Sequence, residues 1–181
     1  MGTQLGVGKE VKAVFGPYIV SAGKSLARSA LLVNTSYGGR GYTISPTLTS
    51  EDIIFDVELD HVIVGTVMMR LDSPNGLAAD MEYAYELNAM RTPGRKLAEL
   101  SRFAIMPGQP TRSVMGAMFH FVYYYAYLLN SVTDLVCEVV PHHIAGQQRI
   151  LGFTQIAGPK RCERVGVDTA VLLHRTLDWD W

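Results

Sequence analysis

Hydrophobic positions follow two different periods along this chain, and each period predicts one kind of element. Alternating or continuous apolar runs predict strands, whereas apolar residues three and four positions apart predict helices. The expected strands cover residues 11–20, 53–59, 62–71, 99–105, 133–140, 153–156 and 170–177, and the expected helices cover residues 22–37, 79–90, 111–130 and 141–152. This order predicts an α/β (α+β) fold with a mixed central sheet and helices on both faces.

Turn and capping residues predict where several elements begin and end. Gly16-Pro17 makes the first run an edge or bulged strand, and Ser21 offers an N-cap to the helix that follows. Thr111 offers a cap to the long helix after it. Pro141 is suited to open the last helix, and Gly152 is suited to close it.

Length and composition favour one domain. With 181 residues, 48% of them hydrophobic, the chain can fill one core well but not two. We expect a loose N-terminus over residues 1–10 and a single domain over residues 11–181. No apolar run approaches the ~20 residues of a membrane span, and the N-terminus lacks the apolar segment of a signal peptide. We therefore expect a cytoplasmic protein without a transmembrane segment.

Charge and cysteine content narrow the possible partners. The net charge is −1 and the isoelectric point is near 6.5, so the molecule as a whole does not attract nucleic acid. Cys137 and Cys162 lack the spacing of a metal-binding pair, and two cysteines in a chain of this size do not suggest a disulfide framework. We expect no metal, and we expect an acidic partner to dock on a local patch only.

Candidate chemistry is concentrated in the predicted strand over residues 99–105. Side chains alternate along a strand, so we expect Glu99, Ser101 and Phe103 on one face and Arg102 on the other. An edge strand with solvated charges is the structural alternative, and the pattern by itself favours that alternative.

Many short motifs, in register along the chain, resemble the bacterial long-chain N-acyl amino acid synthases of the Fee type in the GNAT superfamily. These motifs are Ala30–Asn34, Arg40–Tyr42, Gly65-Thr66, Leu71-Asp72, Gly76-Leu77, Ala79-Asp80, Phe119-His120, Thr133–Leu135, Glu138-Val139, Pro141, His143, Leu151–Phe153, Arg164-Val165 and Ala170–Leu173. Residues 99–104 also resemble acyl-homoserine lactone synthases. The resemblance extends from Ala30 to Leu177, which is most of the chain.

This resemblance implies the GNAT N-acyltransferase fold and a specific reaction. A long-chain fatty acyl group would pass from the phosphopantetheine arm of acyl carrier protein to the α-amine of an amino acid, for which the family suggests tyrosine. No bound cofactor is implied, because the acyl-phosphopantetheine is the donor. Two alternatives stay open: an acyl-homoserine lactone synthase-like enzyme, and a non-catalytic GNAT-shaped protein that binds acyl groups.

The resemblance also suggests roles for individual residues. Glu99 would act as the base and Arg102 would hold the acceptor's carboxylate or support Glu99, whereas an ion pair of Glu99 with Arg95, Lys96 or Arg102 is the structural alternative. The other substrate-binding candidates are Arg40, Tyr42, Ser101, Phe103, Met106, Met115 and Phe119.

The segment Gln109–Val114 lacks the glycines of the usual coenzyme A loop, which fits a donor with one phosphate. Thr111, Arg112 and Ser113 are therefore candidates to bind the phosphopantetheine phosphate, with a plain helix cap as the alternative. Gly146-Gln147 stands where the family usually has an aromatic pair, so leaving-group protonation from this position is in doubt. The cations that could face acyl carrier protein are Arg95, Lys96, Arg112, Lys160, Arg161 and Arg164.

Overall fold

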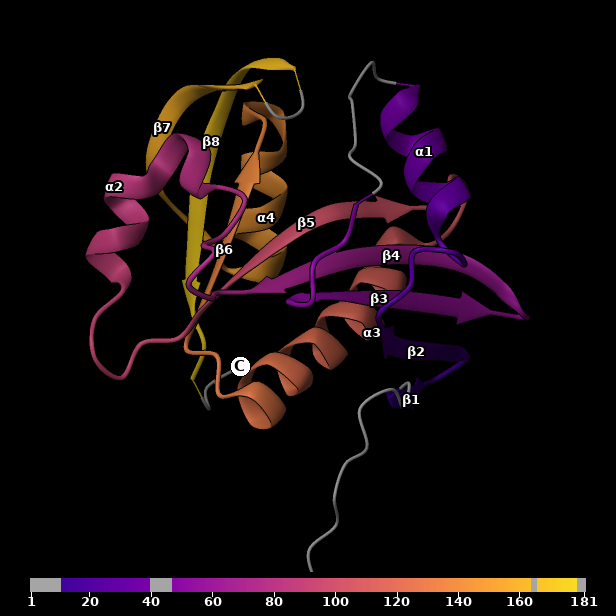
Figure 1. Ribbon diagram of the computed structural model, residues 1–181. Coiled ribbons are helices and arrows are strands. Elements are labelled where there is room, and N and C mark those ends of the chain that lie inside the picture. The colour runs from indigo at the N-terminus through magenta and orange to yellow at the C-terminus, as the bar shows by residue number, and fades with distance from the viewer. Residues whose placement is uncertain (1–10, 40–46, 164–165, 179–181) are drawn as a thin grey trace, which may run out of the picture.

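A computed structural model describes residues 11–39, 47–163 and 166–178 (Figure 1). The strands are β1 (Val11–Phe15), β2 (Tyr18–Gly23), β3 (Asp52–Leu59), β4 (Val62–Leu71), β5 (Leu97–Ile105), β6 (Asp134–Val139), β7 (Thr154–Cys162) and β8 (Val167–Thr176). The helices are α1 (Ala30–Gly38), α2 (Asp80–Met90), α3 (Thr111–Tyr123) and α4 (Ile144–Leu151), with a π-helical turn η1 (Tyr124–Leu129) after α3 and a 3₁₀ turn η2 (Pro141–His143) before α4.

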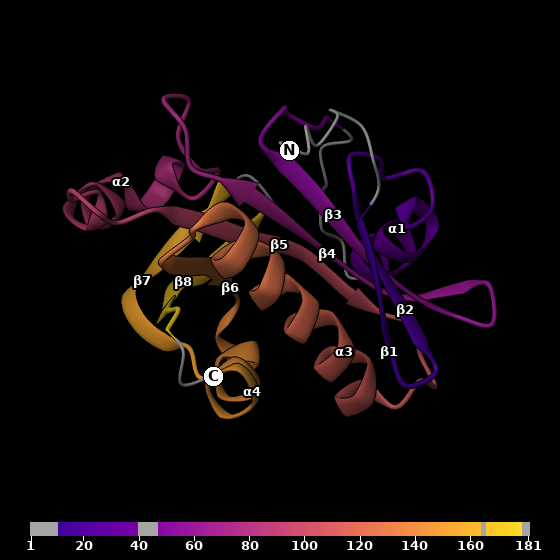
Figure 2. The ribbon, with the colours of Figure 1, turned by 90° about the horizontal axis from the view of Figure 1, so that it is seen from below.

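Within these residues the strands form one mixed sheet in the order β1-β2-β3-β4-β5-β6-β8-β7. Neighbouring strands are antiparallel except β5 and β6, which run parallel. Helices cover both faces, as Figures 1 and 2 show: α1 and α2 lie on one face, and α3 and α4 lie on the other. The predicted architecture is confirmed.

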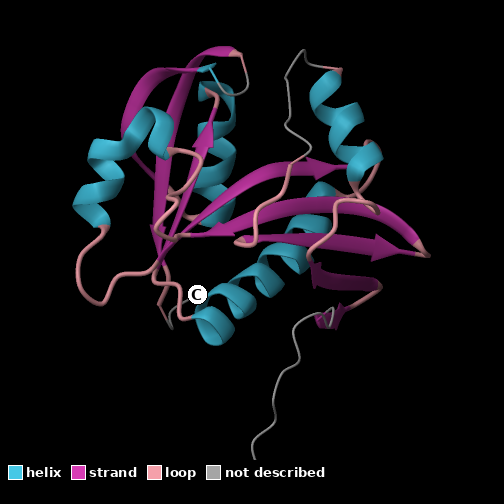
Figure 3. Cartoon of the chain, in the orientation of Figure 1, coloured by secondary structure: helices cyan, strands magenta, loops and turns pink. Residues whose placement is uncertain are grey.

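The N-terminal prediction is wrong in two respects. The run over residues 11–20 forms two strands, because Gly16, with φ +58°, closes a tight turn that pairs Phe15 with Tyr18. The helix predicted from residue 22 begins only at Ala30. Ser21 is a buried strand residue rather than a cap, because β2 pairs with β3 as far as Gly23 and this pairing overrides the helical spacing (Figure 3).

The larger core lies between the sheet and α3. Val114, Met118 and Phe121 of this helix are fully buried against the first strands. The helix approaches β4 closely at Gly65, where an added Cβ would lie 2.7 Å from Val114 Cγ1. Thr111 is the first helical residue, and Pro110, not Thr111, occupies the N-cap position, so the predicted cap is corrected.

The buried carboxylate of Asp134, on β6, connects the segment before β5 to β8. Asp134 is fully buried; Arg95 Nε donates to it at 2.7 Å, and His174 Nε2 lies 2.7 Å from its Oδ1. Burial by itself would raise the pKa of Asp134, but the bonds from His174, Thr133 and Arg95 outweigh burial and lower this pKa below its ordinary value. The carboxylate therefore stabilises the fold in its ionised form.

Strands β5 and β6 pair along only part of their length. Their register runs from Leu97 opposite Asp134 to Leu100 opposite Cys137. Beyond Leu100, β5 continues to Ile105 beside β4 alone, so a wedge opens between β5 and β6. This wedge determines the position of the candidate site.

Candidate active site

A β-bulge interrupts β5 at the start of the wedge. Arg102 has φ +53°, and the register with β4 shifts between the pairs Met68–Ser101 and Thr66–Ala104. A bulge inserts one extra residue and exchanges the faces of the side chains that follow. The ring of Phe103 accordingly lies 5.8 Å from that of Phe119 on α3, on the face opposite Glu99. The prediction that Glu99 and Phe103 share a face is therefore wrong.

The backbone of β5 also faces the wedge. Met106 N–H bonds to Val64 of β4, and alternate residues of a strand direct their backbone groups to opposite edges. Phe103 and Ile105 therefore direct theirs away from β4, toward the wedge. The Tyr37 hydroxyl, from α1, donates to the Phe103 carbonyl at 3.1 Å and ties α1 to this edge.

Three ionisable side chains form a row across the sheet on the face of α1 and α2. Asp52 pairs in register with Arg70, and Arg70 pairs with Glu99. Glu99 is buried, and its Oε2 accepts a hydrogen bond of 3.0 Å from the backbone N–H of Ala79. The carboxylate is thus held at the inner end of the wedge.

Arg70 is fixed by a two-point ion pair that our sequence reasoning missed. Its Nε and Nη2 donate to Asp52 at 2.7 and 2.9 Å, and Asp52 is fully buried. Burial alone would raise the pKa of Asp52, but hydrogen bonds from Arg70 and Thr49 lower it overall. Asp52 directly precedes the predicted strand over residues 53–59 and Arg70 lies near the end of the predicted strand over residues 62–71, so the hairpin pairing was the available signal for this pair. A fixed guanidinium therefore lies one strand away from Glu99.

A cavity of about 580 Å³ occupies the wedge and has walls on both faces of the sheet. On the α1 and α2 face, Glu99, Arg70 and Tyr37 line it. On the other face, its walls include Phe119 of α3 and Gln147 of α4. A substrate chain can therefore pass from one face of the sheet to the other through this cavity.

The cavity brings together about half of the predicted site residues, namely Glu99, Ser101, Arg102, Phe103, Thr111 and Phe119. Met115 is buried in the core beside it, and Met106 packs against that core. Ser113 does not line the cavity. Arg40 and Tyr42 lie outside the described residues.

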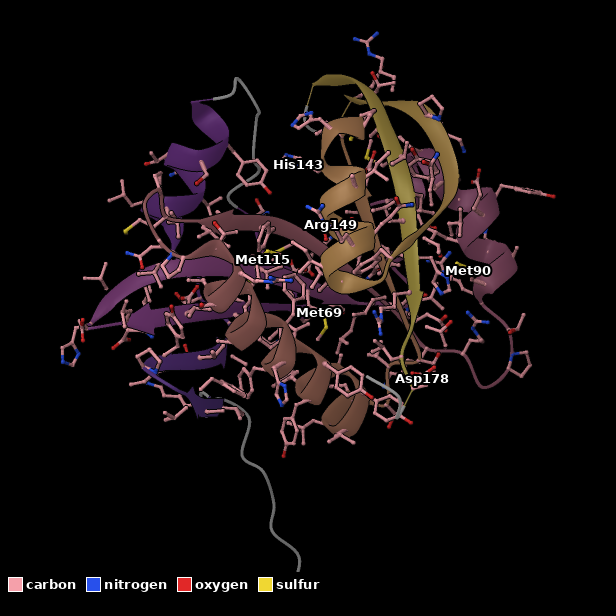
Figure 4. The ribbon with its side chains drawn as sticks, turned by 180° about the vertical axis from the view of Figure 1, so that it is seen from behind. Met69, Met90, Met115, His143, Arg149 and Asp178 are labelled. Atoms are coloured by element: carbon pink, nitrogen blue, oxygen red, sulfur yellow. The ribbon has the colours of Figure 1, made fainter. Side chains whose placement is uncertain are left out.

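A second hollow lies next to the first, at the start of α3. It is lined by Thr111, Arg112, Arg149 and Ile150, and Thr111 belongs to both hollows. Figure 4 shows Arg149 on α4. Two arginines thus line a hollow at the N-terminus of α3 that shares Thr111 with the cavity, which suits an anionic group. Sequence reasoning missed Arg149, which belongs to no motif.

Several cations of the group that we predicted to face acyl carrier protein have other partners in the fold. Arg95 bonds to the buried Asp134, and Lys160 Nζ lies 2.8 Å from Glu86 Oε1 on α2. Arg164 lies outside the described residues. Of the described members of that group, Arg112 lines one of these two hollows.

Both cysteines are buried thiols that line the cavity. Burial, and to a smaller extent the nearby Glu99, raise the pKa of Cys137 well above its ordinary value. Cys162 Sγ lies within 4.8 Å of carboxylate oxygens of Glu82 and Glu138. In the described part of the chain, these three residues are the group close enough to share a metal ion.

A comparison with known protein families explains this geometry. The model of the family "N-acyl amino acid synthase FeeM" matches residues 28–176. The chain belongs to this family. It is an acyltransferase with the GNAT fold, and the predicted family is confirmed.

Solved structures agree with the family assignment. FeeM, an N-acyl amino acid synthase from uncultured soil microbes, is 25% identical over 88% of this chain and 90% of that chain, with a TM-score of 0.77. The acyl-homoserine lactone synthase LasI is 19% identical over 89% and 90%, with a TM-score of 0.57.

A ribosomal-protein-S5-alanine acetyltransferase from Vibrio fischeri is 13% identical over 94% of this chain and 98% of that chain, with a TM-score of 0.63. LasI and this acetyltransferase support the fold alone. No curated protein sequence matches the chain. Among the described residues, no helix combines the length and apolar character needed to cross a membrane.

Proposed function

We propose that this synthase transfers a long-chain fatty acyl group from the phosphopantetheine arm of acyl carrier protein to the α-amine of an amino acid. The observation that carries the proposal is the cavity that joins the two faces of the sheet at Glu99. One face offers ionisable groups for an acceptor, and the other offers apolar walls for an acyl chain. An acyl transfer between a polar and an apolar substrate needs both environments.

On the acceptor side, Glu99 would take the proton of the α-amine, directly or through a water molecule. Its position is fixed by the Ala79 N–H and by the paired strands β4 and β5. The α-carboxylate of the acceptor would lie near Arg70 or Arg102, both of which line the cavity. A guanidinium and a carboxylate on adjacent strands match the two charges of an amino acid.

On the donor side, the phosphopantetheine arm would lie along the open edge of β5, where Phe103 and Ile105 direct their backbone groups. Its phosphate would lie at the start of α3, near Thr111, Arg112 and Ser113, with Arg149 as a further contact. The acyl tail would pass between Phe103 and Phe119 toward α4. These apolar walls suit a long aliphatic chain.

Acyl carrier protein is proposed as the donor because the segment Gln109–Val114 lacks the glycines of a coenzyme A loop, whereas two arginines line the hollow at the start of α3. Cys137 and Cys162 do not suggest a disulfide framework, which suits a reducing compartment, so we place the reaction in the cytoplasm. We propose tyrosine as the first acceptor to examine, since the family suggests it.

The test presents the protein with the same long-chain acyl group on acyl carrier protein and on coenzyme A, together with a mixture of the twenty amino acids. Mass spectrometry should detect an N-acyl amino acid, formed faster from the carrier protein. That rate should fall across a salt series, because exposed charges are screened beyond ~8 Å at physiological ionic strength. Equal rates from both donors without salt dependence would refute the carrier-specific proposal, and an absence of any N-acyl amino acid would refute the acceptor class.

A further inference from the structure

The proposed transfer leaves a thiolate on the phosphopantetheine arm, and this thiolate needs a proton. Alkyl thiols have pKa values near 8.5, so a thiolate formed at neutral pH ends as a thiol. On α4, Gly146 and Gln147 offer no acidic side chain for this purpose.

One wall of the cavity nevertheless offers an imidazole. His143 ends the 3₁₀ turn η2 and lies one helical turn before Gln147, so the two side chains share a face, and both line the cavity. Figure 4 shows His143 between α4 and α1, at the open end of the wedge. Among the described residues that line the cavity, His143 is the one histidine.

Other proton donors in the described cavity wall are less suitable. The Tyr37 hydroxyl already donates to the Phe103 carbonyl. Burial raises the pKa of Cys137, so this thiol is a weaker acid than the thiol that it would have to protonate. Arginine stays protonated throughout. An imidazole, with an ordinary pKa near 6.5, is therefore suited to give up a proton near neutral pH.

We propose that His143 protonates the departing sulfur of the donor, an assignment that rests on the proposed acyl transfer. The amine nitrogen attacks the thioester carbonyl carbon, a C–N bond forms and the C–S bond breaks. Glu99 accepts the proton that the amine loses, and the His143 imidazolium gives its proton to sulfur. One amide and one thiol result, with no change of oxidation state.

The two proton-transfer groups come from different walls of the cavity. Glu99 lies on the face of α1 and α2, whereas η2 leads into α4 on the other face. The nucleophile and the leaving group of a tetrahedral intermediate occupy different positions around the carbonyl carbon. His143 is also exposed to solvent, so it can regain a proton from water between turnovers.

The test varies the basicity of the leaving group. Two donors carry the same acyl chain, one as an alkyl thioester of N-acetylcysteamine and one as an aromatic thioester, whose thiolate is much less basic and leaves more readily. His143→Gln should lower kcat about 10²-fold with the alkyl donor and by less than about threefold with the aromatic donor, because little protonation is then needed. His61→Gln, on the exposed β3–β4 turn, is the matched control and should leave both rates unchanged.

Two results would overturn the assignment. Equal losses with both donors would mean that His143 binds the donor or shapes the cavity, and no loss with either would exclude a role for it. Circular dichroism checks that the variant is folded. If the wild-type protein forms no product from these donors or from acyl carrier protein, the proposed function itself fails, which is a separate outcome from a failure of the His143 assignment.

Discussion

Replacing Gly65 by alanine should destabilise the protein through a single, identifiable clash. The new Cβ would lie 2.7 Å from Val114 Cγ1 and 2.8 Å from Met118 Cε. The methionine end is flexible, but a valine on a helix has little freedom at χ1, so α3 itself must move. Overpacking of this kind costs about 1–3 kcal/mol, and removing a glycine from a strand returns about 0.5–1 kcal/mol.

The net loss is therefore about 0–2.5 kcal/mol, which corresponds to a Tm lower by up to about 10 °C in a chain of this size. Urea unfolding followed by circular dichroism gives the free energy directly. Gly116→Ala, on α3, is the matched control, because nothing lies within 4 Å of its added Cβ. This substitution should stabilise the protein by about 0.5–1 kcal/mol. Val114→Ala should cost less in the Gly65→Ala background than in the wild type. Additive effects of the two substitutions would show that the clash is not the cause.

Three further predictions concern charged groups. Glu99→Gln should keep the fold but lower kcat/KM about 10²–10⁴-fold in a thiol-release assay, and near-normal turnover would exclude Glu99 as the essential base. Arg102→Asn, which tolerates φ +53° better than alanine does, should raise the KM of the amino acid with little change in kcat, and an unchanged KM would leave Arg70 as the carboxylate anchor. Asp134→Asn should lose about 3–5 kcal/mol at pH 7. The folded-state pKa of Asp134 is lowered. The difference in free energy of unfolding between the wild type and the variant should therefore be complete above the unfolded-state pKa near 3.9 and vanish as the pH falls through the folded-state pKa. A difference that persists in acid would contradict the ion-pair account.

Features that depend on local spacing could be predicted from the sequence. The hairpin of β3 and β4, the helix ending before Pro93 and the closure of α4 at Gly152, with φ +67°, all follow from short patterns. The family resemblance, carried by many short motifs, selected Glu99 as the base; this residue lines the cavity, and its catalytic role stays a prediction.

Features that depend on pairing between distant segments could not be predicted. Strand β2 takes Ala22 and Gly23 from a helical pattern because β3 offers hydrogen-bond partners. The bulge at Arg102 has no signal in the sequence, because arginine is not a residue that prefers a positive φ. Arg149 became a candidate only because α4 folds back beside the start of α3.

The bulge divides β5 into two halves that differ in how many neighbouring strands they pair with. From Leu97 to Leu100 the strand is held on both sides by neighbours and its side chains are buried, so apart from Glu99 they serve packing. From Ser101 to Ile105 it has a neighbour on one side only and borders the cavity. Altering the acyl or amino acid preference of this synthase should therefore be attempted in the second half, where a change in side-chain volume reshapes the space for substrates while the first half keeps the sheet assembled.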